Sequence, residues 1–189
     1  MTNVTANTGI DRDAVGSLEE PRKLPTVPLA LELPTTVGLA LMTGFLFNMS
    51  VVTAPALNAL SPEQALAAWK GINSTVHNPL FAVTAFGTAV LVVACAAVAW
   101  RSRLRGWCLS FALLYLVGVI GTTFTVEVGI NRGIVLATAP PPELPRMLWT
   151  WLIGNHIRAL SALAAFVVAW LGFRQSVAPL LRSFEHPVH

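Results

Sequence analysis

The sequence has 189 residues, of which 54% are hydrophobic and 11% are charged. Soluble domains carry roughly 25% charged residues, so this composition excludes an ordinary water-soluble domain and indicates lipid as the main solvent. The formal net charge of +3 is not concentrated in a basic stripe with interleaved aromatic residues, so we expect no nucleic-acid partner.

Four apolar stretches are long enough to cross a bilayer, since a helix needs roughly 20 residues to span a hydrocarbon core of about 30 Å. They cover about residues 34–52, 79–100, 106–126 and 148–173. Their apolar residues are continuous and do not alternate as in barrel strands, and a helix satisfies its own backbone in lipid. We therefore predict an all-α, transmembrane four-helix bundle embedded in a lipid bilayer.

The basic residues sort by side of the predicted membrane. Those before the first span, between the second and third, and after the fourth are Arg12, Arg22, Lys23, Arg101, Arg103, Arg105, Arg174 and Arg182. The other side holds Lys70, Arg132 and Arg146. The positive-inside rule then predicts cytoplasmic N- and C-termini, in a cytoplasmic membrane of the bacterial type. The expected domains are a disordered cytoplasmic tail at 1–27, the transmembrane domain at 28–175 and a second cytoplasmic tail at 176–189.

Two outer connections separate these spans. The first, about 53–78, contains an amphipathic helix opened by Ser61, Pro62 and Glu63, which suit an N-cap and a first turn. We expect this segment to lie along the outer face. The second, about 127–147, holds several prolines that prevent a continuous helix, and we interpret it as a lid.

Arg158 is the residue least suited to lipid. A charge at mid-bilayer costs at least about 2.5–3.5 kcal/mol, and at 1.5 Å per residue Arg158 lies about 15 Å below the outer boundary. Trp151 and Asn155 precede it at i−7 and i−3, so all three line one helix face, which we expect to point into the bundle. His156 is about 160° away around the axis. It can share a site with Arg158 only along a helix seam, or through a kink near Gly154.

Further polar residues gather in the predicted outer half. Thr123 and Glu127 are i, i+4 neighbours on the third helix, with Asn131 another turn on if the helix continues. A pair between Glu127 and Arg158 is electrostatically favourable, but we expect their difference in depth to weigh against a direct contact. The rest of this set is Asn48, His77 and Asn78.

Each of these residues also has a purely structural interpretation. Arg158 can tie helices together through backbone carbonyls, and His156 can make an interhelical hydrogen bond. Glu127 can face water at the interface, His77 can be exposed at a helix start, and Asn131 can cap or turn the chain. Cys95 and Cys108 lack metal-site or disulfide spacing and are interpreted as small apolar residues.

Several motifs are similar to those of one known family. They are Asn78-Pro79-Leu80-Phe81, Thr125-Val126-Glu127-Val128-Gly129-Ile130-Asn131, Trp151, and Asn155-His156-Ile157-Arg158-Ala159-Leu160. In the order and spacing of these motifs, over about residues 35–172, the chain resembles the anthrone-oxygenase-like family of small four-helix membrane proteins. Gly129 stands where many relatives have proline, which leaves the shape of the outer loop open.

The resemblance implies an oxygenase that oxidises a hydrophobic polycyclic aromatic, anthrone-like substrate with molecular oxygen and without a metal, flavin or other cofactor. An anthrone loses an acidic C–H proton to give an enolate that reacts directly with oxygen, so a base, oxyanion donors and an apolar pocket suffice. The expected base is His156 or His77, with Arg158 and Asn155 or Asn131 holding the oxyanion and Trp151 packing on the rings. The candidate catalytic residues are His156, Arg158, Asn131 and His77. The candidate substrate-binding residues are Trp151, Asn155, Glu127, Asn48 and Asn78.

The alternative is a non-catalytic membrane accessory subunit or small-ligand-binding protein whose polar residues only fix helix packing. A pocket open to the outer leaflet distinguishes the two, if it is lined by at least three of His77, Asn131, Trp151, Asn155, His156 and Arg158. A haem or quinone redox protein needs paired axial ligands at one depth, which His77 and His156 do not offer. No sequence feature predicts the oligomeric state or a partner protein.

Overall fold

The computed structural model describes residues 27–76 and 78–185, and in these residues all regular structure is helical. Four helical segments are long and apolar enough to cross a membrane: Leu29–Asn58, Pro79–Arg101, Arg105–Leu136 and Leu144–Gln175. This confirms the predicted all-α four-helix bundle.

Each of the four columns of the bundle contains one of these segments. The first column consists of α1 (Leu29–Asn48), the π-helical turn η2 (Met49–Thr53) and α2 (Ala54–Asn58). The second consists of α3 (Pro62–Val76), α4 (Pro79–Val98) and the 3₁₀ turn η3 (Ala99–Arg101). The third consists of α5 (Arg105–Leu113), the π-helical segments η4 (Leu114–Gly121) and η5 (Thr123–Glu127), and α6 (Val128–Leu136). The fourth is α7 (Leu144–Glu185), which continues as helix beyond the expected domain end at residue 175.

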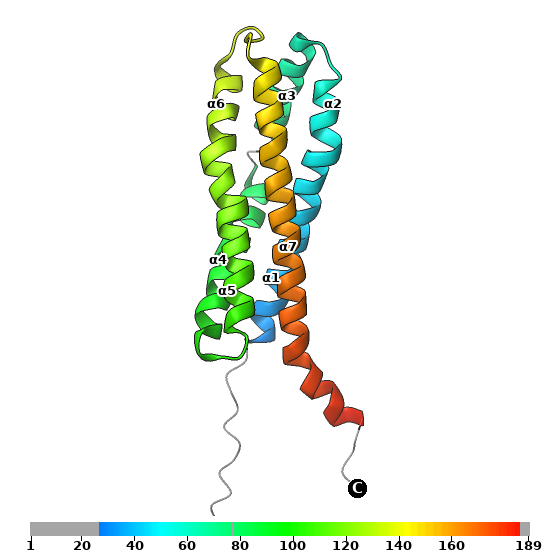
Figure 1. Ribbon diagram of the computed structural model, residues 1–189, viewed down its shortest axis with the longest axis vertical. Coiled ribbons are helices and arrows are strands. Elements are labelled where there is room, and N and C mark those ends of the chain that lie inside the picture. The colour runs from blue at the N-terminus through cyan, green and yellow to red at the C-terminus, as the bar shows by residue number, and fades with distance from the viewer. Residues whose placement is uncertain (1–26, 77, 186–189) are drawn as a thin grey trace, which may run out of the picture.

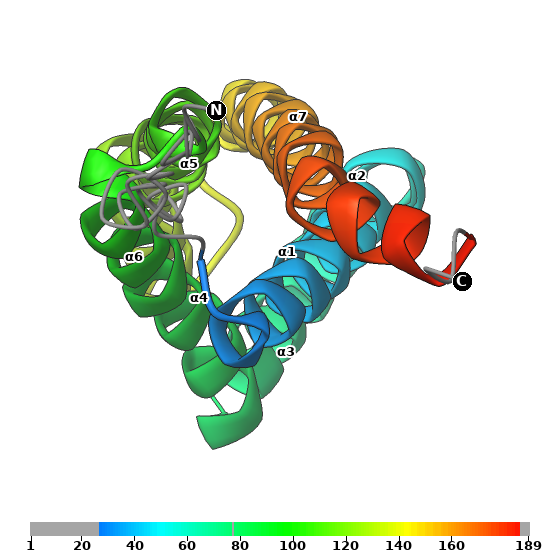
Figure 2. The same ribbon diagram turned by 90° about the horizontal axis from the view of Figure 1, so that it is seen from below.

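The columns stand side by side, as Figure 1 shows from the side. Seen from below, α7 lies between α1 and α5, and α4 closes the ring between the same two helices (Figure 2). Consecutive columns are joined by short connections, so neighbours in the chain run antiparallel. This arrangement brings residues near 50, 80, 125 and 155 to one level of the bundle.

The second column is broken where α3 ends and α4 begins. Asn78 has extended backbone angles, and its side-chain oxygen accepts a hydrogen bond from Phe81 N, so it is the N-cap of α4. Pro79 follows at the first helical position, where a missing N–H costs nothing. The second column is therefore interrupted at this level, and α3 and α4 are two separate helices.

The amphipathic helix predicted at Ser61-Pro62-Glu63 is confirmed as α3. Ser61 Oγ accepts a hydrogen bond from Gln64 N at 3.4 Å, as expected for an N-cap. The helix does not lie apart from the bundle, because it buries Leu66 and Trp69 in a cluster that includes Ile134 of α6. It thus covers the α6 end of the site described below.

Large apolar side chains cover the outside of the bundle. Leu41 of α1, Val83 and Val90 of α4, Leu113 of α5 and Leu160 of α7 are all more than half exposed. A soluble monomer does not expose so much contiguous apolar surface, whereas lipid tails solvate it well. The chain is therefore a membrane protein with transmembrane helices.

Candidate functional site

Arg158 lies inside the bundle and holds three side chains at once. Its Nη2 donates to Asn155 Oδ1 at 2.6 Å and lies 3.4 Å from Glu127 Oε1, and its Nη1 donates to Thr123 Oγ1 at 3.3 Å. Arg158 is 8% exposed and Glu127 is 1% exposed. The guanidinium and the carboxylate therefore form an ion pair shielded from both lipid and water.

The direct contact between Glu127 and Arg158 corrects the expectation that their depths keep them apart. In a helix the Cβ atoms tilt toward the N-terminus, and long side chains point the same way. Because the third and fourth columns run antiparallel, Arg158 leans toward the α6 end of the bundle while Glu127 leans toward the α5 end. The two side chains thus approach each other over a backbone offset of several residues.

The depth of Arg158 can be measured from the opposite end of α7. Arg174 lies over the ring of Trp170 at 4.7 Å, and Arg105 lies over Trp100 at 4.2 Å, so basic and aromatic residues mark one boundary. At 1.5 Å per residue, Arg158 is about 18 Å from Trp170 along the helix, inside a core of about 30 Å. A charge at this depth is costly in lipid, so Arg158 needs its contacts with Asn155, Glu127 and Thr123.

Two tryptophans lie next to the ion pair. Trp69 of α3 and Trp151 of α7 have ring centroids 5.2 Å apart, and both are almost fully buried. Trp69 Nε1 donates to Asn131 Oδ1 at 3.1 Å, which leaves the Nδ2 donor of Asn131 for another acceptor. Asn155 Nδ2 donates to the backbone oxygen of Trp151 at 2.8 Å. These bonds fix both amides and the indole of Trp69.

A small chamber of about 50 Å³ lies among these groups. Arg158, Asn155, Asn131 and Trp151 line it, together with Asn73 and Trp69 of α3. The structure thus brings together four of the residues expected to share a cavity, and the shared face of Trp151, Asn155 and Arg158 is confirmed. A cavity of about 150 Å³ holds benzene, so a chamber of this size suits a single polar group such as a carbonyl better than a ring.

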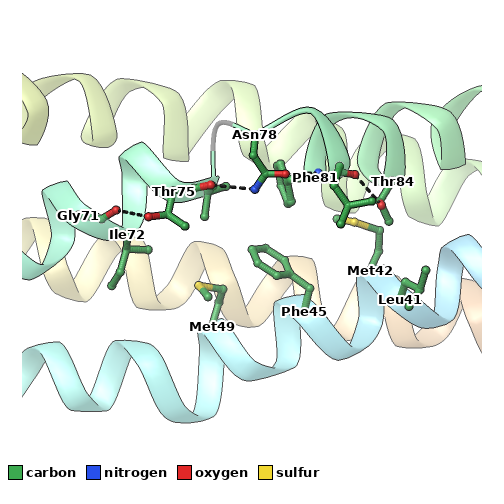
Figure 3. Close-up of a pocket in the computed structure, with 12 residues that line it drawn as sticks. Leu41, Met42, Phe45, Met49, Gly71, Ile72, Thr75, Asn78, Phe81 and Thr84 are labelled. Atoms are coloured by element: carbon green, nitrogen blue, oxygen red, sulfur yellow. Dashed lines mark hydrogen bonds between the residues drawn. The ribbon is translucent and has the colours of Figure 1, made fainter.

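A second cavity of about 650 Å³ adjoins the chamber. Its volume lies within the range of about 300–1,000 Å³ that is typical of small-molecule pockets. Figure 3 shows Met42 and Phe45 of α1 and Met49 of η2 on one side and Ile72 and Phe81 on the other, near the break between α3 and α4. We call this cavity the groove. The groove and the chamber share the lining residues Phe45, Met49, Ile72, Val76 and Phe81.

The polar side chains among the described residues of the groove are already bonded to nearby backbone groups. Thr75 and Thr84 donate to the backbone oxygens of Gly71 and Leu80 at 2.9 and 2.8 Å. Asn78 uses its amide to bond Phe81 N and the backbone oxygen of Thr75, both drawn in Figure 3. The groove therefore offers a ligand a mainly apolar surface. Asn78, which was expected to bind substrate, instead caps α4 and bonds the end of α3.

Two π-helical segments flank the chamber. Ser50 lies on η2, and Thr123 and Glu127 lie at the two ends of η5. A π turn shifts the side chains that follow it around the helix axis, and such turns are frequent at functional sites. In this column Thr123 and Glu127, at i and i+4, both contact Arg158.

His156 does not line the chamber or the groove. Its Nδ1 is hydrogen-bonded to Ser50 Oγ across the seam between the first and fourth columns, while the ring is largely exposed on the outside of the bundle. The expected angular separation from Arg158 holds along a regular α7. The structure thus places His156 in a helix seam and does not bring this candidate base to the other site residues.

Replacing His156 by alanine tests this position. Ser50 is 1% exposed, so its hydroxyl would lose its partner in a dry seam, and we expect a loss of about 1–3 kcal/mol in the free energy of unfolding. The double variant Ser50→Ala/His156→Ala should recover part of that loss, as measured by unfolding in detergent. Equal stability of the single variant and the wild type would contradict the contact.

Another candidate, Asn48, lies away from the chamber. Asn48 is exposed, and its Nδ2 donates to Thr53 Oγ1 on its own column at 3.4 Å. His77 lies outside the described residues. Sequence reasoning missed Trp69, Asn73 and Ser50, because their roles depend on how α3 and η2 pack. The amphipathic pattern of α3, with Trp69 on its apolar face, was the signal that could have indicated Trp69.

No protein-family model matches the sequence, and neither a curated protein nor a solved structure matches it.

Proposed function

We propose that this protein binds a flat, hydrophobic carbonyl compound of the anthrone class and promotes its oxidation by molecular oxygen. The observation that carries the proposal is the end of the groove, where an apolar cavity of about 650 Å³ meets a chamber lined by Arg158 and Asn131. Rings fit the groove, and a carbonyl oxygen fits the chamber. The motifs around Glu127, Asn131 and Arg158 support the same reaction class through their resemblance to anthrone oxygenases.

The reaction needs a stabilised enolate. Loss of one C–H proton converts the ketone to an enolate, which transfers electrons to oxygen and forms a carbon–oxygen bond. The resulting hydroperoxide loses water to give the quinone. One oxygen atom ends in the new carbonyl and the other in water, so the four-electron oxidation of CH₂ to C=O balances the four-electron reduction of O₂.

The chamber favours the first of these steps. Arg158 is fixed by Asn155, Glu127 and Thr123 before any ligand arrives, so its positive charge needs no reorientation as the oxyanion forms. Preorganised donors of this kind act strongly where water is excluded. Asn131 Nδ2 is the second donor, because Trp69 occupies its Oδ1. Both groups bind the enolate more tightly than the ketone, which makes the substrate more acidic.

Glu127 is the described carboxylate nearest to this centre. Its Oε2 has no hydrogen-bond donor among the described residues, although it is fully buried. It stands behind Arg158 rather than in the chamber wall, so its role is to position the guanidinium. The substrate proton then passes to water at the α3 end of the groove, where Gly71 and Thr75 are exposed, and a proton returns to the peroxide anion.

Isotope labelling tests the proposed reaction. Purified protein in lipid nanodiscs is incubated with anthrone under ¹⁸O₂, and product is followed by mass spectrometry against protein-free nanodiscs. We expect anthraquinone that carries one labelled oxygen, formed well above the spontaneous rate. Product formation at the protein-free rate would contradict an oxygenase.

A non-catalytic ligand-binding protein is the second candidate. The observation that favours it is the closed network itself, because Arg158 already has a counter-ion and Asn131 already accepts a bond from Trp69. Under this alternative anthraquinone and anthrone bind, but oxygen consumption does not rise. The labelling experiment distinguishes the two candidates when ligand binding is measured on the same preparation.

We also propose that both termini face the cytoplasm. The described residues that support this are Arg101, Arg103, Arg105 and Arg174, which lie at the end of the bundle that carries the α4–α5 connection. A green fluorescent protein fused to the C-terminus should then fluoresce. Alkaline phosphatase should be active when inserted in the connection 137–143 and inactive at the C-terminus. The reverse pattern would contradict the orientation.

A further inference from the structure

Phe45 of α1 and Phe81 of α4 stand between the groove and the chamber. Their ring centroids are 5.0 Å apart with an interplanar angle of 52°, and both rings line both cavities. Each ring is anchored on a different column, so the separation of the first and second columns sets the width between them. We call this pair the phenylalanine gate.

The groove opens on the side of the bundle rather than at its end. Leu41 and Leu80 line it and are 58% and 76% exposed, on helices that are apolar enough to lie in the membrane. The helix break at Asn78 ends α3 beside this opening. A molecule dissolved in the lipid therefore meets the groove directly, without passing through water.

We infer that ligands enter sideways from the lipid between α1 and α4, and that the phenylalanine gate selects flat rings bearing a carbonyl oxygen on an edge. This inference rests on the proposed function and adds the route by which the substrate enters and the residues that select it. The groove wall is apolar, so it binds any flat hydrocarbon of suitable size. Discrimination must come from the chamber. The two gate rings are in contact, so they must part to let an edge oxygen reach it.

The volumes of the two cavities support binding of the rings in the groove and recognition of the carbonyl in the chamber. A chamber of about 50 Å³ holds a carbonyl group, whereas the groove of about 650 Å³ holds a fused ring system. Aromatic rings prefer tilted or offset contacts at centroid distances of about 4.5–7 Å, and the gate rings already provide such faces. A ring that slides along them brings its edge oxygen toward Arg158, while a hydrocarbon of the same shape leaves the chamber unfilled.

Binding without turnover tests the gate. Radiolabelled anthraquinone is bound to the full-length protein in nanodiscs under nitrogen, with unlabelled anthracene as a competitor of the same shape. Since hydrogen bonds to a charged group contribute strongly, we expect anthraquinone to bind about tenfold more tightly than anthracene. This preference should vanish in Arg158→Leu/Glu127→Leu. Equal competition by anthracene in the wild type would overturn the proposed selection.

A matched pair of substitutions on α4 separates the gate from general packing. Phe81→Trp should narrow the gate and weaken anthraquinone binding about tenfold, leaving anthracene little affected. Phe86→Trp makes the same change at a residue that is 50% exposed and lines neither cavity, so binding should not change. The same loss in both variants, or in neither, would reject the gate.

Access from the lipid is tested at the mouth of the groove. Leu41→Trp should slow the association of anthraquinone several-fold, whereas Leu113→Trp, at an exposed residue of α5 outside the groove, should not. Equal association rates would overturn sideways access. Because no assay here measures product, failure of the gate leaves the oxidation proposal standing, and failure of the labelling experiment leaves the gate standing.

Discussion

Arg158→Leu is expected to abolish product formation and to lower the free energy of unfolding by about 3–5 kcal/mol. The loss of activity follows because the variant has no cation for the developing oxyanion. The loss of stability follows because Glu127, at 1% exposure, would keep a buried carboxylate without its partner. Product formation from anthrone and unfolding in detergent measure the two effects separately.

The double variant Arg158→Leu/Glu127→Leu is the matched control. Replacing both members of a buried ion pair by apolar residues is often neutral or stabilising, so most of the lost stability should return. Activity should stay absent, because the stabilised network still lacks the guanidinium. Recovery of activity in this double variant would show that Arg158 only maintains the fold.

Gly154→Ala is expected to lower activity about a hundredfold and to cost about 1–3 kcal/mol of stability through overpacking. A Cβ atom at this position would collide with Glu127 Oε1 and lie 3.4 Å from Val126 Cγ1. The carboxylate would have to move, and Arg158 would lose the counter-ion that fixes its direction. Steady-state rates and unfolding measurements report both consequences.

Gly87→Ala on α4 is the matched control for this prediction. A Cβ atom there meets nothing within 4 Å, and alanine is favoured over glycine in a helix by about 1 kcal/mol. We therefore expect unchanged activity and equal or slightly higher stability. Similar losses in both glycine variants would mean that the contact between Gly154 and Glu127 is unimportant.

The helical architecture was predictable because it depends on local pattern. Continuous apolar stretches predicted the four spans, and Ser61, Pro62 and Glu63 predicted the start of the amphipathic helix. The structure nevertheless extends the third helix to Leu136, since the polar residues around Asn131 can face α3 instead of water. The spans predicted from hydropathy alone were accordingly too short.

The face shared by Trp151, Asn155 and Arg158 was also predictable, since 3.6-residue periodicity determines it. The contact from Arg158 to Glu127 was not, because it depends on the direction of long side chains in antiparallel helices.

An interhelical hydrogen bond was one predicted role of His156, but the particular bond to Ser50 was not predictable. It requires the π turn η2 and the packing of α1 on α7, neither of which has a signal in composition or spacing.

The most direct test of the account is the absorption spectrum of bound anthrone under nitrogen. An enolate is more extensively conjugated than its ketone and absorbs at longer wavelength, so its formation can be seen without any reaction with oxygen. We predict the enolate band with wild-type protein and its absence with Arg158→Leu/Glu127→Leu. Bound anthrone that keeps the ketone spectrum in the wild type would contradict a chamber built to hold the oxyanion.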